Sequence, residues 1–374
     1  MIKRILFITA YPPNDRTAGQ NYTQHLLTDL SKNYQVDLIY WKYGNHQVSL
    51  PGKIDSIACY VTNSFLKTLF YSVCLGIFPL FTVRFNWNVV RYLRQIASRY
   101  DMIYFDYSQT FIYSFFVNHP YKVKMCHDII AQKYSRKKFA FVYNWWVRLS
   151  EHRFLDKQDY ILCFSEKDQC QIASLYDLKA DVVAFYIDSK IKDMNLSVIQ
   201  LEQCFFFYGA WNRKENSEGL IWFIKEVLPH CKNSVRFKVI GGGLSDDLVD
   251  IIAGRSNMEY VGFVDNPYSQ IVKCQALIAP LFNGAGVKVK VVETLALGTP
   301  VIGTDIAFEG IKNIVAGSRH ALTTFHSSLQ LAKLLNEFQP VSLNEKIELR
   351  SKFFSSYSNN KFVDILRRMD VCRK

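Results

Sequence analysis

Short runs of apolar residues alternate with segments of helical periodicity along most of the chain. In the first half these runs are ILFITAY, QVDLIYW, MIYFDY, KVKMCHD and YILCFS, and in the second half CFFFYGA, SVRFKVIG, MEYVGFV, ALIAPLF and PVIGT. Such alternation is typical of strand–helix–strand units whose strands form a mainly parallel sheet. A chain of 374 residues is long enough for two domains. The sequence therefore predicts an α/β protein with two doubly wound, Rossmann-like domains.

The boundary between the domains is predicted where the alternation stops. Residues 189–203 are polar and lack a clear period, so we interpret them as a linker. The first domain is then expected over residues 1–188 and the second over residues 204–350. Residues 351–374 are expected to end in a basic helix that packs back on the first domain.

Positive charge is concentrated in the first domain. The chain carries 45 Lys and Arg against 33 Asp and Glu, and residues 1–150 alone hold 18 against 7. This surplus favours partners that carry phosphates or form a membrane surface. A basic nucleic-acid-binding protein is one alternative, although no RNP, helix-turn-helix or zinc motif accompanies the charge.

The cysteines and the N-terminal residues indicate in which cellular compartment the protein is expected and whether disulfides or metal sites are expected. Nine cysteines are scattered without a C-x-x-C pair, so neither a disulfide framework nor a metal site is expected. The first apolar run stops at Pro12 after seven residues and lacks a cleavage site, which favours a buried strand over a signal peptide. We expect a cytoplasmic protein, either free or at the inner face of the cell membrane.

One segment raises the question of membrane contact. Residues 69–83 carry no charge, but they are too few to span a bilayer and include Pro79. One interpretation is a helical hairpin packed on the core. The other is a patch within residues 65–99 that dips into the bilayer interface. In that case anionic headgroups would be bound by Arg84, Arg91, Arg94 and Arg99.

The most informative loop follows the predicted strand ALIAPLF and leads into a helix. It reads NGAGVKVKVVE and ends at Glu293. In parallel sheets ligands bind beyond the carboxyl ends of strands, where helix N-termini present free N–H donors. Gly284 and Gly286 let the main chain approach a ligand, and Lys288 and Lys290 add positive charge. The pattern predicts a diphosphate site in which the carboxylate accepts hydrogen bonds from sugar hydroxyls. The alternative is a solvated Lys–Glu pair worth only ~0.2–0.5 kcal/mol.

Residues 284–311, GAGVKVKVVETLALGTPVIGTDIAFEGI, strongly resemble the donor-site region of GT-B glycosyltransferases, in particular the retaining family 4. GAWNRKENSEGLIWFIKEVLP at 209–229 is similar to the first loop and helix of that family's second domain. Shorter matches are VIGGG at 239–243, YVGFV at 260–264, ILCFSEKD at 161–168 and His127–Asp128. The resemblance implies two Rossmann-like domains that face each other across a cleft. It also implies transfer of a sugar from a nucleotide diphosphate sugar.

The resemblance assigns roles to residues of the second domain. Glu293 would bind the ribose, and the main chain of residues 284–287 would hold the sugar and the diphosphate. Arg213 and Lys214 would neutralise the leaving diphosphate, and Phe263 falls where the main chain contacts the base. The predicted donor-binding residues are Gly209, Arg213, Lys214, Gly241, Phe263, Gly284, Ala285, Gly286 and Val287. The predicted catalytic residues are His127, Lys288, Lys290 and Glu293.

Two of these positions leave questions open. Many family members carry a second glutamate eight residues before the one that matches Glu293, and this chain has Ala285 there, so the donor sugar is not indicated. Glu309 is a further candidate for contact with that sugar. Gly241 opens a G-G-G turn that resembles part of a dinucleotide fingerprint, but a bare strand-to-helix turn fits better than an NAD site because the third glycine is absent.

Candidate residues in the first domain follow predicted strands. His127 matches the acceptor-domain histidine that lies near the transferred sugar in the family, and a histidine packed in the core is the alternative. Asp106 and Tyr107 end the strand MIYFDY, and Gly19 and Gln20 follow the first strand and its loop. The carboxyl ends of parallel strands meet at one edge of a sheet, so these four residues are candidate acceptor contacts.

The leading hypothesis is a metal-independent glycosyltransferase. It would move a sugar, with retention, from a UDP- or GDP-sugar to a hydroxyl of a lipid-linked saccharide in cell-surface polysaccharide or lipopolysaccharide biosynthesis. Helix-start amides and basic side chains would stabilise the departing diphosphate. No paired carboxylates suit a double displacement, and the resemblance implies a same-face mechanism in which the leaving phosphate helps to take the acceptor proton. A GT-B sugar-nucleotide epimerase is the alternative enzyme.

Overall fold

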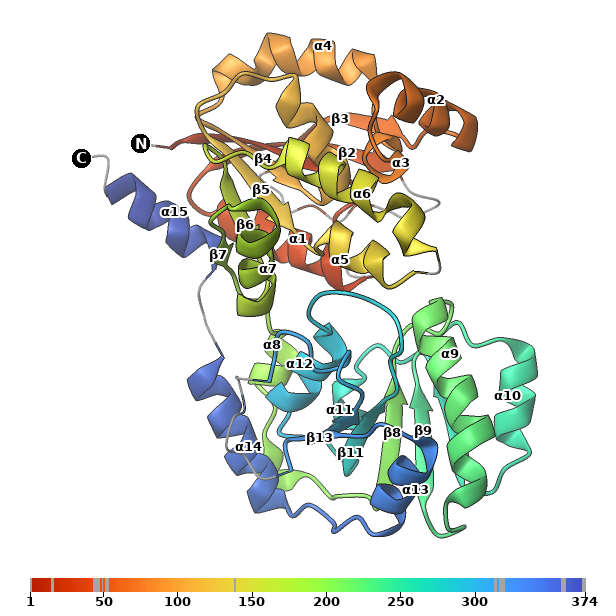
Figure 1. The fold of residues 1–374 in the computed structure, drawn as a ribbon. Coiled ribbons are helices and arrows are strands. Elements are labelled where there is room, and N and C mark those ends of the chain that lie inside the picture. The colour runs from red at the N-terminus through yellow and green to blue at the C-terminus, as the bar shows by residue number, and fades with distance from the viewer. Residues whose placement is uncertain are drawn as a thin grey trace. The chain divides into compact units, whose positions relative to one another are not determined.

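The computed structural model describes residues 2–14, 17–42, 48, 50, 54–137, 139–312, 315, 320–357 and 361–371, with the backbone alone for 368–371. The chain divides into two compact units (Figure 1). Unit 1 comprises Met1–Tyr186 and Asn359–Lys374, and unit 2 comprises Ile187–Ser358. Each unit contains one parallel sheet with helices around it. The predicted α/β architecture with two Rossmann-like sheets is confirmed.

The sheet of unit 1 has the strand order β3-β2-β1-β4-β5-β6-β7. Its strands are β1 (Arg4–Thr9), β2 (Gln35–Lys42), β3 (Ile54–Val61), β4 (Met102–Asp106), β5 (Lys122–Cys126), β6 (Tyr160–Cys163) and β7 (Asp181–Val182). The chain moves outward from β1 to β3 and then returns to the other side of β1 with β4. This reversal places the carboxyl ends of β1 and β4 side by side, which is where open sheets bind ligands.

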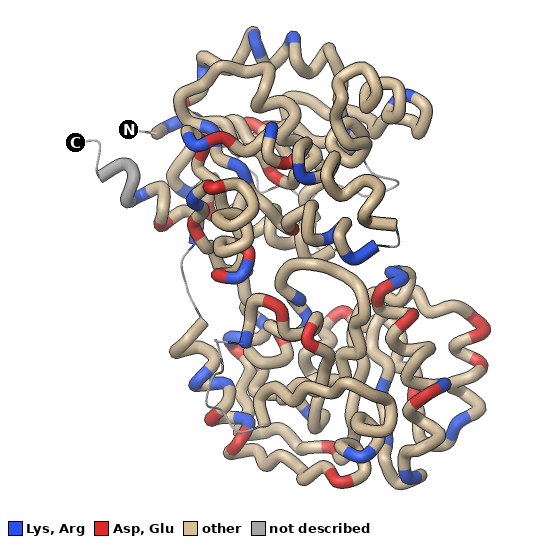
Figure 2. The backbone as a smooth tube through the Cα atoms, in the orientation of Figure 1, with Lys and Arg blue, Asp and Glu red and all other residues tan. Residues whose placement is uncertain are grey.

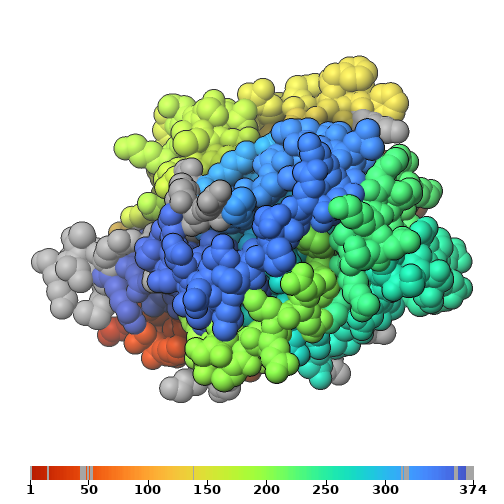
Figure 3. Space-filling model, turned by 90° about the horizontal axis from the view of Figure 1, so that it is seen from below, coloured from red at the N-terminus to blue at the C-terminus, as the bar shows by residue number. Residues whose placement is uncertain are grey.

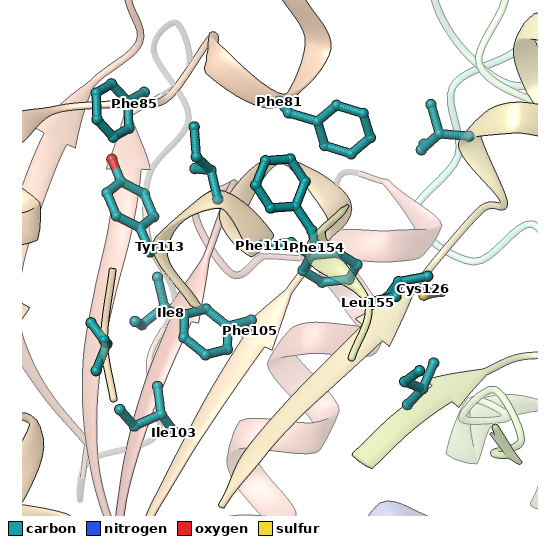
Figure 4. Close-up of a cluster of buried hydrophobic side chains, with 14 of the residues drawn as sticks. Ile8, Phe81, Phe85, Ile103, Phe105, Phe111, Tyr113, Cys126, Phe154 and Leu155 are labelled. Carbon is teal, nitrogen blue, oxygen red and sulfur yellow. The ribbon is translucent and has the colours of Figure 1, made fainter. Parts of the chain in front are cut away.

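The helices of unit 1 cover both faces of this sheet. They are α1 (Ala18–Leu30), α2 (Phe65–Leu75), α3 (Pro79–Thr82), α4 (Trp87–Ile96), α5 (Ile130–Ser135), α6 (Ala140–Phe154), α7 (Glu166–Tyr176) and α15 (Phe362–Val371), with 3₁₀ turns at Ala97–Arg99 and Ser108–Phe115. Figure 4 shows Phe105 of β4 on the same side of the sheet as Phe81 of α3 and Phe154 of α6. These rings are fully or nearly fully buried, and their apolar surface stabilises this side of the unit.

The last described helix, α15, belongs to unit 1. Phe362 is buried, and the centroid of its ring lies 5.0 Å from that of Tyr104 in β4. Lys361, which precedes the helix, places its Nζ atom 3.7 Å from Asp29 of α1. The chain therefore returns to its first unit after completing the second.

The segment expected to contact a membrane forms α2, α3 and α4. None of the helices in the described ranges is both long and apolar enough to cross a bilayer. Arg84 is buried, its Nε atom donates a hydrogen bond of 2.5 Å to the carbonyl oxygen of Ala10, and its guanidinium lies over the ring of Tyr11. The expectation that Arg84 contacts lipid headgroups is therefore wrong, because the folded chain encloses its charge.

The sheet of unit 2 has the strand order β10-β9-β8-β11-β12-β13. Its strands are β8 (Cys204–Tyr208), β9 (Arg236–Ile240), β10 (Met258–Gly262), β11 (Ala276–Ala279), β12 (Val301–Gly303) and β13 (Leu322–Thr324). The chain again runs outward, from β8 to β10, and returns to the other side of β8 with β11. The carboxyl ends of β8 and β11 are neighbours for the same topological reason as in unit 1.

Seven helices among the described residues surround the sheet of unit 2. They are α8 (Ser189–Lys192), α9 (Lys214–Trp222), α10 (Asp246–Ala253), α11 (Tyr268–Ile271), α12 (Val289–Ala296), α13 (Ser328–Asn336) and α14 (Leu343–Ser356). α9 continues through a π-helical turn, Phe223–Val227, into a 3₁₀ turn, Leu228–His230. In Figure 3 the blue region that includes α13 and α14 occupies much of the face drawn.

The segment expected as a linker contributes to the core of unit 2. Ile191 of α8 and Leu196 are buried there. Arg350 of α14 donates hydrogen bonds of 2.7 to 2.8 Å to three carbonyl oxygens of this segment. Lys346, also in α14, is fully buried and donates to the carbonyl oxygens of Val272 and Cys274. These bonds attach α14 and residues 189–203 to the body of the unit.

Candidate functional site

The loops that follow β8 and β9 touch each other at a glycine. Gly241 adopts a φ of +117°, in the region that favours glycine. A Cβ atom at this position would overlap the carbonyl oxygen of Gly209 in the neighbouring loop. Gly241 also donates a backbone hydrogen bond of 2.8 Å to Gly262, at the end of β10. The structure therefore brings together three of the loops in which sequence analysis placed donor contacts.

The glycine loop between β11 and α12 is held by a lysine. Gly284 and Gly286 have φ values of +121° and +70°. The Nζ atom of Lys288 donates hydrogen bonds to the carbonyl oxygens of Ala285, at 3.0 Å, and Gly286, at 2.6 Å. It also lies 3.9 Å from Glu309, a candidate for sugar contact. Lys288 thus braces the loop while keeping its charge at the start of α12.

Lys290 lies one residue into α12 and is partly enclosed by the chain. Its Nζ atom donates a 2.9 Å hydrogen bond to Oδ1 of Asn216 in α9. Burial of the ammonium group, followed by repulsion from Arg213 and Lys288, lowers the pKa of Lys290 to about 7. Three basic side chains are therefore gathered near the glycine loop, and an anion bound there would relieve the repulsion among them and favour the protonated form of Lys290.

The structure separates the two basic residues at the start of α9. The positive charge of Arg213 contributes to the lowered pKa of Lys290, and the Arg213 guanidinium donates a 2.6 Å hydrogen bond to Glu215. Lys214 is highly exposed and lies 3.6 Å from Glu218, one turn further along the helix. Arg213 therefore belongs to the cationic cluster, whereas the described contacts of Lys214 lie along α9.

Glu293 lies one turn after Lys290, on the same side of α12. The hydroxyl of Tyr268 in α11 donates a 2.9 Å hydrogen bond to its Oε1 atom. Burial raises the pKa of Glu293 to about 7, and the negative charge of Asp188 adds to this effect. The hydrogen bond from Tyr268 acts in the opposite direction. A carboxylate in this setting gains from hydroxyl groups that donate to it, such as those of a ribose.

The remaining donor-side candidate is Phe263, which directly follows Gly262. Gly262 has a φ of +77°, and the Phe263 side chain is 77% exposed. A Cβ atom on Gly242 would approach the Cβ atom of Phe263 to 3.2 Å. Phe263 therefore lies beside the G-G-G turn, and its ring is open to a ligand that reaches this turn.

Sequence analysis missed two residues of this site. Asn216 links Lys290 to the β8 loop, because its Nδ2 atom donates to the carbonyl oxygen of Ala210 at 2.9 Å. Tyr268 supports Glu293 as described above. Asn216 lies inside a stretch that was matched to the family, but neither residue stands in a motif that signals hydrogen bonding to α12.

In unit 1 the carboxyl ends of β1, β4 and β5 hold a connected set of polar side chains. Asp106, which ends β4, is fully buried, and its Oδ1 atom lies 2.7 Å from Nε2 of His127. Its other oxygen accepts hydrogen bonds from Thr9 at 2.9 Å and from Thr23 at 2.6 Å. The carboxylate fixes the orientation of the imidazole, so in neutral His127 the proton resides on Nε2 and Nδ1 is an acceptor.

The other acceptor-side candidates surround this histidine. The ring of Tyr107 stacks on His127 with a centroid distance of 3.7 Å, and its backbone adopts a φ of +67°. A Cβ atom on Gly19 would stand 2.5 Å from the Tyr107 hydroxyl and 3.3 Å from Nδ1 of His127. Gln20 is buried and donates to the carbonyl oxygen of Pro12 at 2.8 Å. The four predicted acceptor-side residues and His127 therefore cluster, with Gln20 shaping the loop.

The side chains of the two clusters differ in the ligands that they suit. Among the described residues, no three His, Cys, Asp or Glu side chains are grouped so as to hold a metal ion. The charges of the unit 2 cluster come from Lys288, Lys290 and Arg213, and its hydrogen-bond acceptor is Glu293. The arrangement suits a negatively charged ligand that also carries hydroxyl groups.

Comparison with known proteins gives a family match for part of the chain and a fold for nearly all of it. Residues 202–338 match the family model described as glycosyl transferases group 1. The comparison with curated proteins finds no match. Among solved structures, HepE of Anabaena in complex with UDP is similar over 99% of both chains, with 15% identity and a TM-score of 0.65.

Two further structures show the same similarity. WaaG, described as a glycosyltransferase involved in lipopolysaccharide biosynthesis, matches with 12% identity and a TM-score of 0.66 over 95% of this chain and 96% of its own. The sucrose-phosphate synthase of Thermosynechococcus elongatus matches with 12% identity and a TM-score of 0.64 over 99% and 98%. Similarity at these identities concerns the fold, which all three share with this chain across almost its whole length.

Proposed function

We propose that the chain is a glycosyltransferase in which unit 2 binds a nucleotide diphosphate sugar and the sugar is transferred to an acceptor hydroxyl. The match of residues 202–338 to the glycosyl transferases group 1 model and the GT-B fold shared with the similar structures support this proposal. The observation that carries this proposal is the placement of Lys288, Lys290 and Glu293 around the glycine loop that opens α12. HepE was solved with UDP and with UDP-glucose, which supports a UDP-sugar as the first donor to test, followed by GDP-sugars.

Each part of the nucleotide sugar is assigned to the residues whose charge and hydrogen-bonding groups suit it. Main-chain amides of residues 284–287, Lys290 and Arg213 hold the diphosphate, because they combine donors with positive charge. Glu293 accepts hydrogen bonds from the ribose hydroxyls. The turn at Gly241 and the loop at Phe263 receive the base.

Transfer requires stabilisation of the departing diphosphate. The cationic cluster provides this stabilisation before the reaction starts, so the charge that develops on the leaving group meets groups already in place. We propose that this cluster serves where other enzymes use a metal ion. The sugar configuration is retained, with the leaving phosphate helping to take the acceptor proton. His127, held by Asp106, contacts a hydroxyl of a saccharide substrate.

The acceptor is proposed to be a lipid-linked saccharide. WaaG and WaaB, two similar structures, are described as enzymes of lipopolysaccharide biosynthesis or of its outer core. The basic charge of the first 150 residues, 18 Lys and Arg against 7 Asp and Glu, suits an acceptor held at an anionic membrane. The enzyme would act on the cytoplasmic side, in the assembly of a cell-surface polysaccharide or lipopolysaccharide, with Gly19, Asp106 and Tyr107 near the acceptor.

A screen of nucleotides and activated sugars tests the donor assignment. UDP, GDP and their sugars are added to the full-length protein, and the melting temperature is measured, since a ligand of the native state stabilises it in proportion to RT ln(1 + [L]/Kd). We expect one nucleotide series to raise the melting temperature. Lys290→Met and Glu293→Gln should each weaken that effect about tenfold or more in ligand concentration.

Transfer itself is measured with the donor found in the screen and a lipid-linked saccharide, and the anomeric configuration of the product is read by NMR. Lys333→Met is the control, because this lysine lies on the exposed side of α13. Full turnover by both the Lys290 and the Glu293 variants would contradict the donor site. An epimerised nucleotide sugar formed without acceptor would contradict the transferase.

A further inference from the structure

α2 turns large apolar side chains outward and small polar ones inward. Phe65, Phe70 and Val73 are 79%, 63% and 71% exposed, whereas Thr68 and Ser72 are buried. Ser72 donates a hydrogen bond of 2.5 Å to the carbonyl oxygen of Ile77, which satisfies its buried hydroxyl. A helix on the surface of a soluble protein normally shows the opposite pattern. The outer face of α2 is therefore suited to an apolar partner.

α6 and the residue before it carry a second set of outward apolar side chains. Phe141 is 83% exposed and Trp145 is 64% exposed. The spacing of four residues places both on one side of the helix. The full set in this region is Phe139, Phe141, Val142, Trp145 and Leu149.

The two helices are neighbours in unit 1 (Figure 1). The indole Nε1 atom of Trp146 donates a 3.0 Å hydrogen bond to the carbonyl oxygen of Gly76, the residue that ends α2. The backbone N–H of Phe78 donates to the hydroxyl of Ser150 in α6 at 2.9 Å. Ring contacts of Phe78 with Trp146 and Tyr143 complete the junction. The apolar sets of α2 and α6 therefore belong to adjoining elements and not to separate parts of the unit.

The charges around both sets are positive. Residues 56–100 contain no Asp or Glu and five Lys or Arg, of which Arg84 is buried, and residues 129–150 contain five Lys or Arg and no Asp or Glu. In Figure 2 the tube from α2 to α4 accordingly carries blue segments and no red ones. Lys67 and Arg148 are exposed on the helices themselves. Apolar and aromatic side chains bordered by cations are the combination that binds the interface of an anionic bilayer.

We propose that unit 1 binds an anionic phospholipid bilayer through the exposed side chains of α2 and of residues 139–149, called here the apolar face. The side chains enter the headgroup region, and the surrounding Lys and Arg residues lie at the phosphates. A second copy of the chain is a poorer partner, because two faces of the same positive charge repel each other. The proposal rests on the proposed function in one respect, since a lipid-linked acceptor gives the contact its use.

Co-sedimentation of the full-length protein with vesicles tests the proposal. Vesicles of phosphatidylcholine alone are compared with vesicles that also contain about one third phosphatidylglycerol, at low salt and at about 0.5 M salt. We expect binding to the anionic vesicles, weakened by salt. The double variants Phe65→Ser with Phe70→Ser, and Phe141→Ser with Trp145→Ser, should each reduce binding about tenfold or more, because each removes two large apolar groups from the contact.

The matched control is Leu329→Ser, which alters an apolar side chain of α13 in unit 2 that is exposed to a similar degree. It should bind vesicles like the unchanged protein. Circular dichroism and the nucleotide-induced shift in melting temperature verify that each variant is folded. Because that shift reports on unit 2, it separates failure of the bilayer proposal from failure of the donor assignment.

Two results would overturn the proposal. One is vesicle binding that neither double variant reduces. The other is absence of vesicle binding together with a dimer, detected by light scattering, that the double variants dissociate, which would identify a second copy as the partner of the apolar face.

Discussion

Lys290 and Glu293 should each change protonation state when a nucleotide binds, by exchanging a proton with the solvent. Burial and neighbouring cations lower the pKa of Lys290 to about 7, while burial and Asp188 raise the pKa of Glu293 to about 7. A diphosphate favours the protonated lysine, and ribose hydroxyls that donate hydrogen bonds favour the ionised glutamate. Binding should therefore take up a proton at Lys290 above pH 7 and release one from Glu293 below pH 7.

Titration calorimetry with UDP, in two buffers of different ionisation enthalpy, measures this exchange. Because both pKa values lie near 7, the free Lys290 is mostly unprotonated at pH 8 and the free Glu293 is mostly protonated at pH 6. We expect Lys290→Met to abolish an uptake approaching one proton at pH 8, and Glu293→Gln to abolish a release of similar size at pH 6. Equal proton exchange in the unchanged protein and both variants would refute the assignment.

Asp106 acts through His127, so we treat it as a positioning residue. Asp106→Asn preserves the size of the side chain but removes the negative oxygen that faces Nε2 of His127. Loss of the fixed tautomer should lower kcat about 100-fold. The KM for the donor and the nucleotide-induced melting shift should change less than about twofold, because unit 2 is untouched.

Asp101→Asn provides the comparison for this variant. Asp101 is a carboxylate of the same unit that accepts hydrogen bonds from the backbone of Lys3 and Arg4, away from His127. Its replacement should leave kcat within about twofold of the unchanged enzyme. A similar loss of kcat in both variants would mean that Asp106 matters only for stability.

At the scale of elements, the loops after β8 and β9 can touch because Gly241 has no Cβ atom. Gly241→Ala would place a Cβ atom against the carbonyl oxygen of Gly209 in a backbone with φ of +117°. We expect a loss of about 2 kcal/mol or more in the free energy of unfolding, together with weaker nucleotide binding. Urea denaturation and the nucleotide-induced melting shift measure the two effects.

Gly254→Ala is the matched substitution at the end of α10. Gly254 has a φ of −73°, and the atom nearest to an added Cβ lies 3.6 Å away. The free energy of unfolding should change by no more than about 0.5 kcal/mol. If Gly241→Ala behaved in the same way, the two loops would have to be mobile enough to separate.

At the scale of the whole molecule, the chain closes unit 1 only with its last helix. Phe362 is buried against Tyr104, so Phe362→Ala should cost unit 1 about 3–5 kcal/mol of unfolding free energy. In thermal unfolding with and without UDP, we expect the transition that does not respond to UDP to shift downward. The transition that responds to UDP should remain, because it belongs to unit 2.

Arg367→Ala serves as the control on the exposed side of the same helix, where Arg367 forms an ion pair with Asp364, one turn away. It should change the free energy of unfolding by less than about 0.5 kcal/mol. A downward shift of the UDP-responsive transition by Phe362→Ala alone would contradict the division of the chain into these two units.

The sequence by itself determined the two parallel sheets and the location of the glycine loop. Strands buried on both faces appear as continuous apolar runs, and helices between them show a period of 3.6, so local pattern predicted the central strands of both sheets. It missed β3 and β7, because β3 is largely exposed and β7 has only two residues. The same local logic placed Gly284, Gly286 and Lys288 between β11 and α12, as the structure has them. The resemblance to a family added the donor assignment, which local pattern alone did not supply.

Tertiary structure decided which side chains meet and which faces stay exposed. Asn216 bonds to Lys290 although 74 positions separate them in the sequence, and Tyr268 bonds to Glu293 across 25 positions. The order of the strands in the sheet brings these residues together, and local periodicity does not reveal it. Arg84 is buried although its sequence context is basic, and α2 buries its polar side instead of its apolar one. Periodicity identifies two faces of a helix, but only packing against the rest of the chain selects the face that meets water or a partner.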